Sequence, residues 1–351
     1  MTAGIQSLIE AGSTIWLDSV DPDEFKDNLS WGVSGATSNP IIVADLVSSG
    51  RFDDTFTKRA DQGLDDEGIA WAMTDDLVKT AQDRVHDAWK SSNGQTGWVS
   101  FELDPLIDAE DSDLSHEQRV DKYIALGKQW SHGHDNRMIK VPATPAGLDA
   151  IEPLCAEGIA LNITLVFTQR QYDLARDAMW RGAQQRPRLD GFKSVYSIFV
   201  SRVDVYTHKH VTDLSPDTQG QVGIANAKRL WKRNADYWRD KSCPLRQEII
   251  FASTGAKLEG DPFDKYLAAF SGSDIMTNPP ETNRKIQESG KSYDRRIDQL
   301  PPQAILDEID SKVDIQQMED TLLREGLAKF ADPQRELIET IGKRRTQLTS
   351  A

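Results

Sequence analysis

Short apolar runs recur along the first 280 residues, and most of them are separated by longer segments in which apolar residues have helical spacing. Each run is rich in β-branched or aromatic residues, which is typical of a strand. The eight runs are Thr14–Leu17, Val33–Thr37, Trp98–Leu103, Met138–Val141, Ala160–Val166, Val195–Val200, Glu248–Ala252 and Asp274–Met276. The clearest helical segments are Gly147–Glu157, Gln169–Gly182 and Asp213–Arg239. The pattern therefore predicts eight strands that alternate with helices.

Alternation of eight strands with helices is the pattern of a (β/α)8 barrel. An open, doubly wound sheet is the competing architecture, and a glycine-rich phosphate loop after the first strand would favour it. The segment that follows Leu17 contains no such loop. We therefore expect an α/β fold, namely a (β/α)8 TIM barrel with additional helices.

The chain is longer than such a barrel requires. Its 351 residues exceed the ~250 of a typical barrel by about 100. We expect helical inserts at about 49–95 and 203–247, and a helical C-terminal extension at about 286–351 in which Pro301 and Pro302 mark a break. No repeat or low-complexity linker divides the chain. We therefore expect a single barrel domain over residues 1–351.

The composition is acidic, with 41 Lys and Arg against 56 Asp and Glu and a formal net charge of −15. Nucleic acids and anionic membrane surfaces both attract clustered positive charge, so we expect neither as a partner. An anionic ligand would need a positive site built locally against this field. The excess acid should then lie on the outer helices and in the acidic segment Leu103–Lys122, which we expect to be a solvated loop or helix start.

The cysteines and the N-terminus bear on the compartment. Cys155 and Cys243 are the only two cysteines, which excludes a dense disulfide framework. The segment Met1–Gly12 shows neither a basic region nor a long apolar run, and no apolar stretch reaches ~18 residues. We expect a cytoplasmic protein without a signal peptide or a transmembrane helix, present as a monomer or a homodimer.

Side chains alternate across a strand, so one set faces the barrel lumen and the other faces the helices. The apolar sets must pack under the helices, and Leu161, Ile163 and Leu165 form one of them. The polar sets then point into the lumen, near the C-terminal strand ends where barrel enzymes place their chemistry. This lumen-facing set comprises Asp18, Asn39, Glu102, Lys140, Asn162, Thr164 and Ser197.

The whole set is more informative than any one member, because a single lysine or carboxylate at a strand end is usually solvated or structural. Burying Lys140 with carboxylates is costly unless the groups pair or react. Burial lowers the pKa of an amine, and a neutral amine attacks a ketone to form a Schiff base. Glu102 and Asp18 could divide the proton transfers that follow.

Two histidine pairs, at positions 132 and 134 and at positions 208 and 210, lie in polar segments and have an unconvincing spacing for metal ligands. No nicotinamide-binding fingerprint is present. We therefore expect neither a metal nor an organic cofactor.

Seven segments of the sequence resemble the transaldolase family in their order and spacing. The resemblance extends from about Thr14 to Asn283, and the residues in its motifs are most similar to those of a bacterial subgroup. The segments are WLDS (Trp16–Ser19), GATSNP (Gly35–Pro40), VSFELDP (Val99–Pro105), MIKVPAT (Met138–Thr144), GIALNITLVFT (Gly158–Thr168), SIFVSRVD (Ser197–Asp204) and FASTGAK (Phe251–Lys257).

The resemblance implies a barrel enzyme of the pentose phosphate pathway. Such an enzyme transfers a dihydroxyacetone unit from sedoheptulose 7-phosphate or fructose 6-phosphate to glyceraldehyde 3-phosphate or erythrose 4-phosphate. Sugar phosphates are thus the expected small-molecule partners. The unit would be carried as a Schiff base on Lys140, with Asp18 as acid and base on the substrate hydroxyl. Glu102 and Thr164 would hold a proton-shuttling water.

The resemblance also assigns binding roles at the same face. Asn39 and Asn162 would bind hydroxyls, while Ser197 and Arg202 would line the channel. Arg202 lies beyond its strand end, where a guanidinium can clamp a phosphate with two hydrogen bonds. The full set of expected binding residues is Asn39, Asn162, Ser197, Phe199, Arg202, Ser253 and Lys257.

Two alternatives remain open. One is an enzyme like fructose-6-phosphate aldolase, which shares the lysine and releases free dihydroxyacetone. Phe199 favours transfer, because the aldolases tend to carry Tyr at that position and are much shorter. The other is a non-catalytic barrel homologue, which a missing lysine or carboxylate would have indicated.

Overall fold

The computed structural model describes residues 3–349 and contains eight parallel strands in a closed barrel, as the sequence predicts. β1 pairs with β8 as well as with β2, which closes the sheet on itself. The strands are β1 (Thr14–Leu17), β2 (Ala36–Thr37), β3 (Val99–Glu102), β4 (Arg137–Pro142), β5 (Leu161–Val166), β6 (Ser194–Phe199), β7 (Glu248–Ala252) and β8 (Ile275–Asn278).

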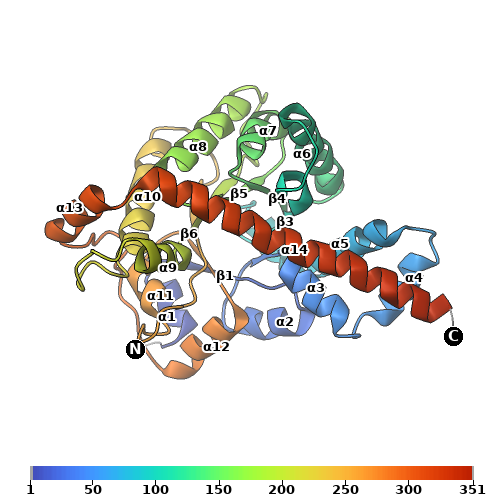
Figure 1. Cartoon of the computed structure of the whole chain (residues 1–351), viewed down its shortest axis with the longest axis horizontal. Coiled ribbons are helices and arrows are strands. Elements are labelled where there is room, and N and C mark those ends of the chain that lie inside the picture. The colour runs from blue at the N-terminus through green and yellow to red at the C-terminus, as the bar shows by residue number, and fades with distance from the viewer. Residues whose placement is uncertain (1–2, 350–351) are drawn as a thin grey trace.

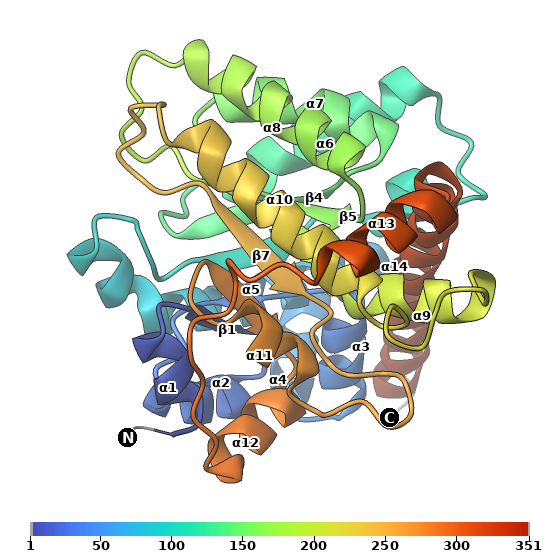
Figure 2. The same cartoon turned by 90° about the vertical axis from the view of Figure 1, so that its left-hand side faces the viewer.

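Helices surround the barrel and lie between successive strands (Figures 1 and 2). The first half of the chain forms α1 (Ile5–Glu10), α2 (Pro22–Ser30), α3 (Pro40–Ser48), α4 (Asp53–Ala60), α5 (Asp66–Ser91), the 3-10 helix η1 (Pro105–Asp108), α6 (His116–Ser131) and α7 (Pro145–Ala156). The second half forms α8 (Gln169–Gln184), α9 (Ser201–His210), α10 (Val222–Trp238), α11 (Lys265–Phe270), α12 (Pro280–Ser289), α13 (Gln303–Lys312) and α14 (Ile315–Thr349).

Two boundaries and the burial of one segment differ from the sequence-based expectation. β2 is only two residues long, because Ala36 and Thr37 alone have paired partners on β3. The helical pattern expected from position 213 begins only with α10, after a stretch of turns. The acidic segment that follows β3 is not wholly solvated, since Asp104 and Asp108 are buried and Asp108 accepts hydrogen bonds from Tyr123 and Thr144.

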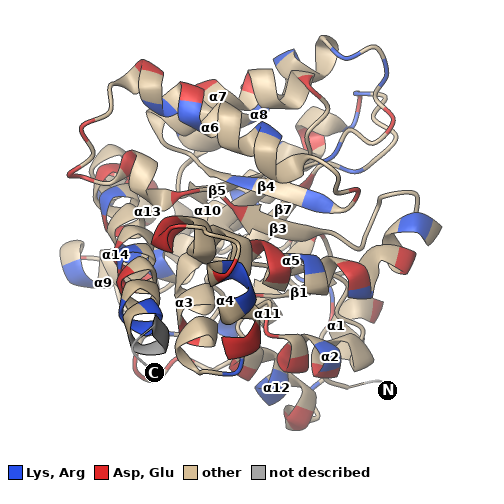
Figure 3. Cartoon of the chain, turned by 90° about the vertical axis from the view of Figure 1, so that its right-hand side faces the viewer, with Lys and Arg blue, Asp and Glu red and all other residues tan. Residues whose placement is uncertain are grey.

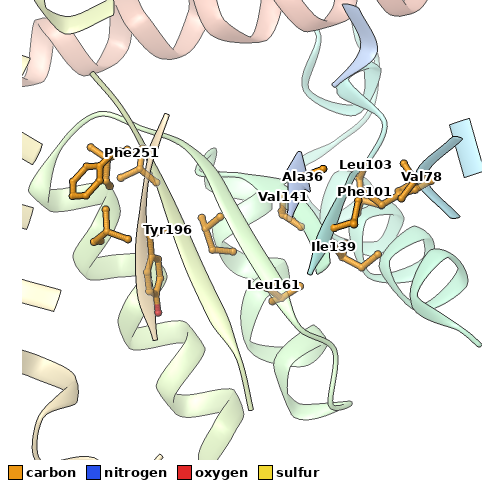
Figure 4. Close-up of a cluster of buried hydrophobic side chains, with 14 of the residues drawn as sticks. Ala36, Val78, Phe101, Leu103, Ile139, Val141, Leu161, Tyr196 and Phe251 are labelled. Atoms are coloured by element: carbon orange, nitrogen blue, oxygen red, sulfur yellow. The ribbon is translucent and has the colours of Figure 1, made fainter. Parts of the chain in front are cut away.

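The apolar side chains of the strands form two separate layers. The outer layer lies between the strands and the helices and includes Phe101, Ile139 and Val141 (Figure 4). The inner layer includes Trp16 and Met138, which lie on the opposite faces of their strands. This separation is the one expected from alternation along a strand. Burial of the outer layer is the main apolar contribution to the stability of the barrel.

Leu165 is an exception to the alternation. We expected it on the outer face with Leu161 and Ile163, but it belongs to the inner layer. The pairing of β5 with β6 shifts register between Ile163 and Val166, and Leu165 has a φ of 54°. Such a bulge turns the bulged side chain away from the regular alternation. The expectation for Leu165 was therefore wrong.

The helix α14 crosses the barrel and contacts α3, α5, α9 and η1 (Figure 1). Near its start, Glu319 accepts hydrogen bonds from Thr168 and Arg170, which follow β5. In its middle, Gly326 lies against Leu165, and a Cβ atom at Gly326 would come within 2.9 Å of a Leu165 methyl carbon. Near its end, Arg344 pairs with Asp53 of α4. Contacts along its whole length therefore fix α14 over one end of the barrel.

Charged residues are distributed mainly over the helices around the barrel (Figure 3). Acidic and basic segments are mixed there rather than separated onto opposite faces. Within residues 3–349, none of the helices has both the length and the apolar character needed to cross a membrane.

A buried ion pair lies at the N-terminal end of the barrel strands. Lys193 precedes β6 and donates hydrogen bonds to Glu248, the first residue of β7, and to the carbonyl oxygen of Arg246. The side chains of Lys193 and Glu248 are 0% and 4% exposed. In TIM barrels this end of the strands serves stability rather than chemistry.

We expect Lys193→Met to lower the free energy of unfolding by about 3 kcal/mol, because Glu248 would stay buried without its main cation. Urea denaturation would measure the change. Lys79→Met is a matched control, since the pair of Lys79 with Asp83 is exposed and should contribute little. An equal effect of the two substitutions would contradict the role assigned to the buried pair.

Candidate active site

A cavity of about 200 Å³ lies at the C-terminal ends of the barrel strands. Most of the residues singled out in the sequence line it, although they come from six different strands or the segments after them. The lining residues predicted from sequence are Asp18, Asn39, Lys140, Thr164, Ser197, Phe199, Arg202, Ser253 and Lys257. Glu102 and Asn162 do not line the cavity but contact residues that do.

The central contact of the cavity joins Lys140 to Glu102. These two residues are register partners on β4 and β3, so their side chains leave neighbouring strands on the same face. Lys140 Nζ donates hydrogen bonds to Glu102 Oε2 at 2.9 Å and to the carbonyl oxygen of Ser38 at 3.2 Å. Both side chains are 6% exposed. The amine is therefore held in one place by a carboxylate and a backbone carbonyl.

Burial raises the pKa of Glu102 above its usual value, although the charge of Lys140 and the hydrogen bond from it act in the opposite direction. The negative charge of Asp18 adds to the increase. A carboxyl group whose pKa is raised holds a proton more readily and can pass it to a neighbouring group. Glu102 is thus suited to proton transfer beside the amine.

A hydrogen-bonded chain of polar side chains continues from β5 to β6 and β3. Asn162 donates from Nδ2 to Ser100 Oγ at 2.9 Å and accepts at Oδ1 from Ser197 Oγ at 2.7 Å. Asn162 is fully buried, and Ser197 is the member of this chain that lines the cavity. The amide of Asn162 therefore fixes the orientation of the Ser197 hydroxyl.

The carboxylate of Asp18 is positioned by two threonines. Thr37 donates a hydrogen bond to Asp18 Oδ1 at 2.7 Å, and the hydroxyls of Thr37 and Thr277 lie 2.9 Å apart. Nearby, Asn39 is the N-cap of α3, where its Oδ1 accepts from the backbone N–H of Ile42. The cap occupies the carbonyl end of the Asn39 amide, so the amide nitrogen is the group that it can offer to the cavity.

The hydroxyl of Thr164 is buried and has no hydrogen-bond partner among residues 3–349. It lies next to the bulge at Leu165 and lines the cavity. A buried hydroxyl without a partner is costly. Thr164 is therefore a candidate to bind a group that occupies the cavity.

One side of the cavity is basic. Arg202 has two buried guanidinium nitrogens, Nε and Nη1, that lack a hydrogen-bond partner within the described part of the chain. Lys257 Nζ donates to Ser253 Oγ at 3.1 Å, and Ser253 holds a left-handed φ of 56°. Burial lowers the pKa of Lys257 to about 8, and the nearby positive charges of Arg202 and Lys329 contribute. Uncompensated positive charge at this side favours an anionic group.

Phe330, which belongs to α14 and also lines the cavity, was not predicted from the sequence. Its ring centroid lies 5.6 Å from Lys140 Nζ and 5.9 Å from the guanidinium carbon of Arg202. Thr37 and Thr277 line the cavity as well and were not predicted either. Alternation from Asn39 could have identified Thr37, but Phe330 lies in the tail, where no motif pointed to the cavity.

The cavity combines three chemical properties. It holds an amine next to a carboxyl group, a second carboxylate positioned by hydroxyls, and a basic side with unpaired donors. This arrangement suits a small polyhydroxylated anion that carries a carbonyl group. Across residues 3–349, no three His, Cys, Asp or Glu side chains are grouped so as to hold a metal ion.

We expect Lys140→Met to make stability more sensitive to pH. Because the pKa of Glu102 is raised in the folded protein, its contribution to stability is present at acidic pH and is lost as pH rises through that value. Removal of the Lys140 charge raises this pKa further, so the loss between acidic and neutral pH should grow. Urea denaturation at several pH values would measure it. In Lys140→Met/Glu102→Gln the extra loss should disappear, and an unchanged pH profile in the single variant would contradict the coupling.

Comparisons with known proteins agree with this geometry. The family model described as Transaldolase/Fructose-6-phosphate aldolase matches residues 15–341. A protein named Transaldolase from Mycolicibacterium paratuberculosis is 30% identical over 99% of this chain and 98% of its own length. Proteins of the same name from Mycobacterium tuberculosis and Mycobacterium ulcerans are 28% and 32% identical, over 95% and 72% of both chains. The chain therefore belongs to the transaldolase/fructose-6-phosphate aldolase family.

Proposed function

We propose that the protein is a transaldolase that works through a Schiff base on Lys140. It would transfer a dihydroxyacetone unit from sedoheptulose 7-phosphate or fructose 6-phosphate to glyceraldehyde 3-phosphate or erythrose 4-phosphate. The observation that carries the proposal is the buried contact of Lys140 with Glu102 in a cavity that also has a basic side. The family and the names of the relatives support the same activity.

The first half of the reaction forms the covalent adduct and breaks a carbon–carbon bond. The neutral amine of Lys140 attacks the ketone carbon, and the carbinolamine loses water to give the iminium. Glu102 supplies and recovers the protons at this carbon, with Thr164 holding the water that connects them. Asp18 then takes the proton of the hydroxyl next to the breaking bond. The aldose phosphate leaves, and the electron pair of the broken bond forms an enamine on Lys140.

The second half reverses these steps with a different aldose phosphate. The enamine attacks the new aldehyde carbon, and Asp18 returns its proton to the alkoxide that forms. Water then attacks the iminium, and the ketose phosphate leaves Lys140 as the free amine. Each step uses side chains of the chain itself.

The remaining lining residues would orient the substrate. Arg202 and Lys257 would hold the phosphate, because a guanidinium offers several fixed donors and a lysine adds charge. Ser197 would present the chain of hydrogen bonds from Asn162 to a hydroxyl of the dihydroxyacetone unit. Asn39 would donate to another hydroxyl from its amide nitrogen. In this proposal Asn162 orients Ser197, instead of binding the sugar by itself.

Phe330 would favour transfer over release of free dihydroxyacetone. Its ring is 5% exposed and lies over Lys140 and Arg202, so it limits the access of water to the adduct. Phe199 lines the same cavity and packs against Phe167, with the two ring centroids 5.6 Å apart and the rings tilted by 55°, which adds to the apolar wall. An aldolase that releases dihydroxyacetone is the second candidate function, since the family includes both activities.

Borohydride reduction in the presence of fructose 6-phosphate should place a stable adduct on Lys140, as located by peptide mass mapping. Lys140→Ala should lose the adduct and nearly all activity, because the second amine of the cavity, Lys257, donates to Ser253 and not to a carboxyl group. Lys228 is a matched control, since burial lowers its pKa to about 8 but it lies outside the cavity and donates to the carbonyls of Arg296 and Gln299. An adduct on Lys257, or an adduct that persists in Lys140→Ala, would overturn the mechanism.

Phe330→Ala should raise the release of dihydroxyacetone relative to transfer by about tenfold, which corresponds to ~1.4 kcal/mol between two competing steps. The ratio is measured by assaying fructose 6-phosphate turnover with and without erythrose 4-phosphate. Phe330→Leu is the matched control, because leucine keeps an apolar side chain over the adduct. If the wild-type protein turns over fructose 6-phosphate without erythrose 4-phosphate as fast as with it, and releases dihydroxyacetone, the protein is an aldolase.

A further inference from the structure

A second, smaller cavity of about 130 Å³ lies beside the catalytic cavity. Its walls come from α9, from the segment after β7 and from α14. Its acidic and basic side chains are Arg202, Lys209, His210, Lys257, Lys329 and Glu325, so that five basic residues face one acid, and Tyr206 also lines it. The apolar part of the wall includes Val205 and Leu322. In a chain with a net charge of −15, this is a local reversal of sign.

Arg202 and Lys257 line both cavities. Arg202 is the better placed of the two to serve both, because its Nε and Nη1 are buried and without a hydrogen-bond partner in the described chain. Lys209 and Lys329 line only the outer cavity, where they are exposed to solvent. The outer cavity therefore leads from solvent to the two residues that form the basic side of the inner one.

Within the described residues 3–349, none of the basic side chains of the outer cavity forms a direct ion pair, although the charge of Asp18 in the inner cavity acts on both Arg202 and Lys257. Glu325 is the one acid in its lining, and its charge acts on Arg202. The charges of Arg202 and Lys329 both disfavour the protonated form of Lys257. Like charges that line one small cavity raise the energy of the folded protein unless an anion lies between them.

We propose that the outer cavity is a second anion-binding site, which receives the phosphate group of an arriving sugar phosphate before it enters the catalytic cavity. The role in substrate entry rests on the proposed function, whereas the binding of an anion does not. Arg202 and Lys257 would contact the phosphate in both positions, so the anion would move inward without losing these partners. Lys209 and Lys329 would contact it only in the outer position.

The cavity is large enough for this ligand. Its volume of about 130 Å³ exceeds that of several water molecules, each of which occupies ~30 Å³ in the liquid. The rest of a sugar phosphate would extend into solvent or toward the inner cavity. A single phosphate group is therefore the part of such a ligand that fits between the three walls.

Sulfate is a suitable probe, because it has the shape of phosphate and keeps its charge over the relevant pH range. Wild-type protein titrated with sulfate in a calorimeter should bind two ions per chain. Crystals grown with sulfate should show one ion in each cavity. Lys209→Ala/Lys329→Ala should lose the outer ion and keep the inner one. The double variant Lys79→Ala/Lys343→Ala is matched in charge. It should keep both ions, since these lysines pair with Asp83 and Glu339 and line neither cavity.

The kinetic consequence separates binding from chemistry. At low ionic strength Lys209→Ala/Lys329→Ala should lower kcat/KM for a ketose phosphate by up to about tenfold, with kcat unchanged, because attraction of an anion acts on its encounter with the site. The difference from wild type should shrink as salt is raised to ~0.15 M and above. The charge-matched control should show neither change.

The outcomes distinguish this proposal from the proposed function. A single sulfate in wild type, or two in Lys209→Ala/Lys329→Ala, would overturn the outer site whatever the enzyme catalyses. Two sulfates with unchanged kcat/KM in the variant would overturn its role in entry. Failure of adduct formation on Lys140 would overturn the transaldolase mechanism. The number of bound sulfate ions would still decide whether the outer site exists.

Discussion

The site depends on the burial of one pair of opposite charges inside a barrel of parallel strands. Lys140 and Glu102 are register partners, so the sheet itself brings the amine and the carboxyl group together. Removing either partner would leave the other as a buried charge, which costs several times more than an exposed one. The surrounding hydroxyls and amides are arranged to satisfy this pair and its neighbours. The chemistry of the cavity thus follows from strand pairing as much as from the identity of the residues.

The helix α14 connects the barrel to the cavity through packing. Its small residue Gly326 allows close contact with Leu165, which the bulge of β5 turns inward. This contact sets the position of Phe330, one turn further along the helix, over Lys140. The bulge also lies next to Thr164, whose hydroxyl is buried without a partner in the described chain. A local irregularity in one strand therefore determines both an unpaired polar group and the placement of an apolar cover.

Residues on the strands could be predicted because alternation has a period of two and does not depend on the rest of the fold. This rule placed Glu102, Lys140, Asn162 and Ser197 correctly on the lumen face, and the register of the strands brought them together. The rule failed at Leu165, because a bulge interrupts the alternation of side chains between the two faces of the strand. The sequence around Leu165 does not indicate this bulge. It could not reach Phe330 either, because the side of α14 that faces the cavity is decided by contacts with distant elements. Asn162 was placed correctly, but its hydrogen bonds turn it toward Ser100 and Ser197 instead of the cavity.

The position of α14 in the chain has a consequence for biosynthesis. All eight strands precede this helix, so Lys140 and Glu102 are synthesised long before Phe330. Domains generally fold as units, so the barrel and its cover complete their packing only after α14 has emerged. Closure by α14 would then be the last step by which the newly made chain acquires a protected amine.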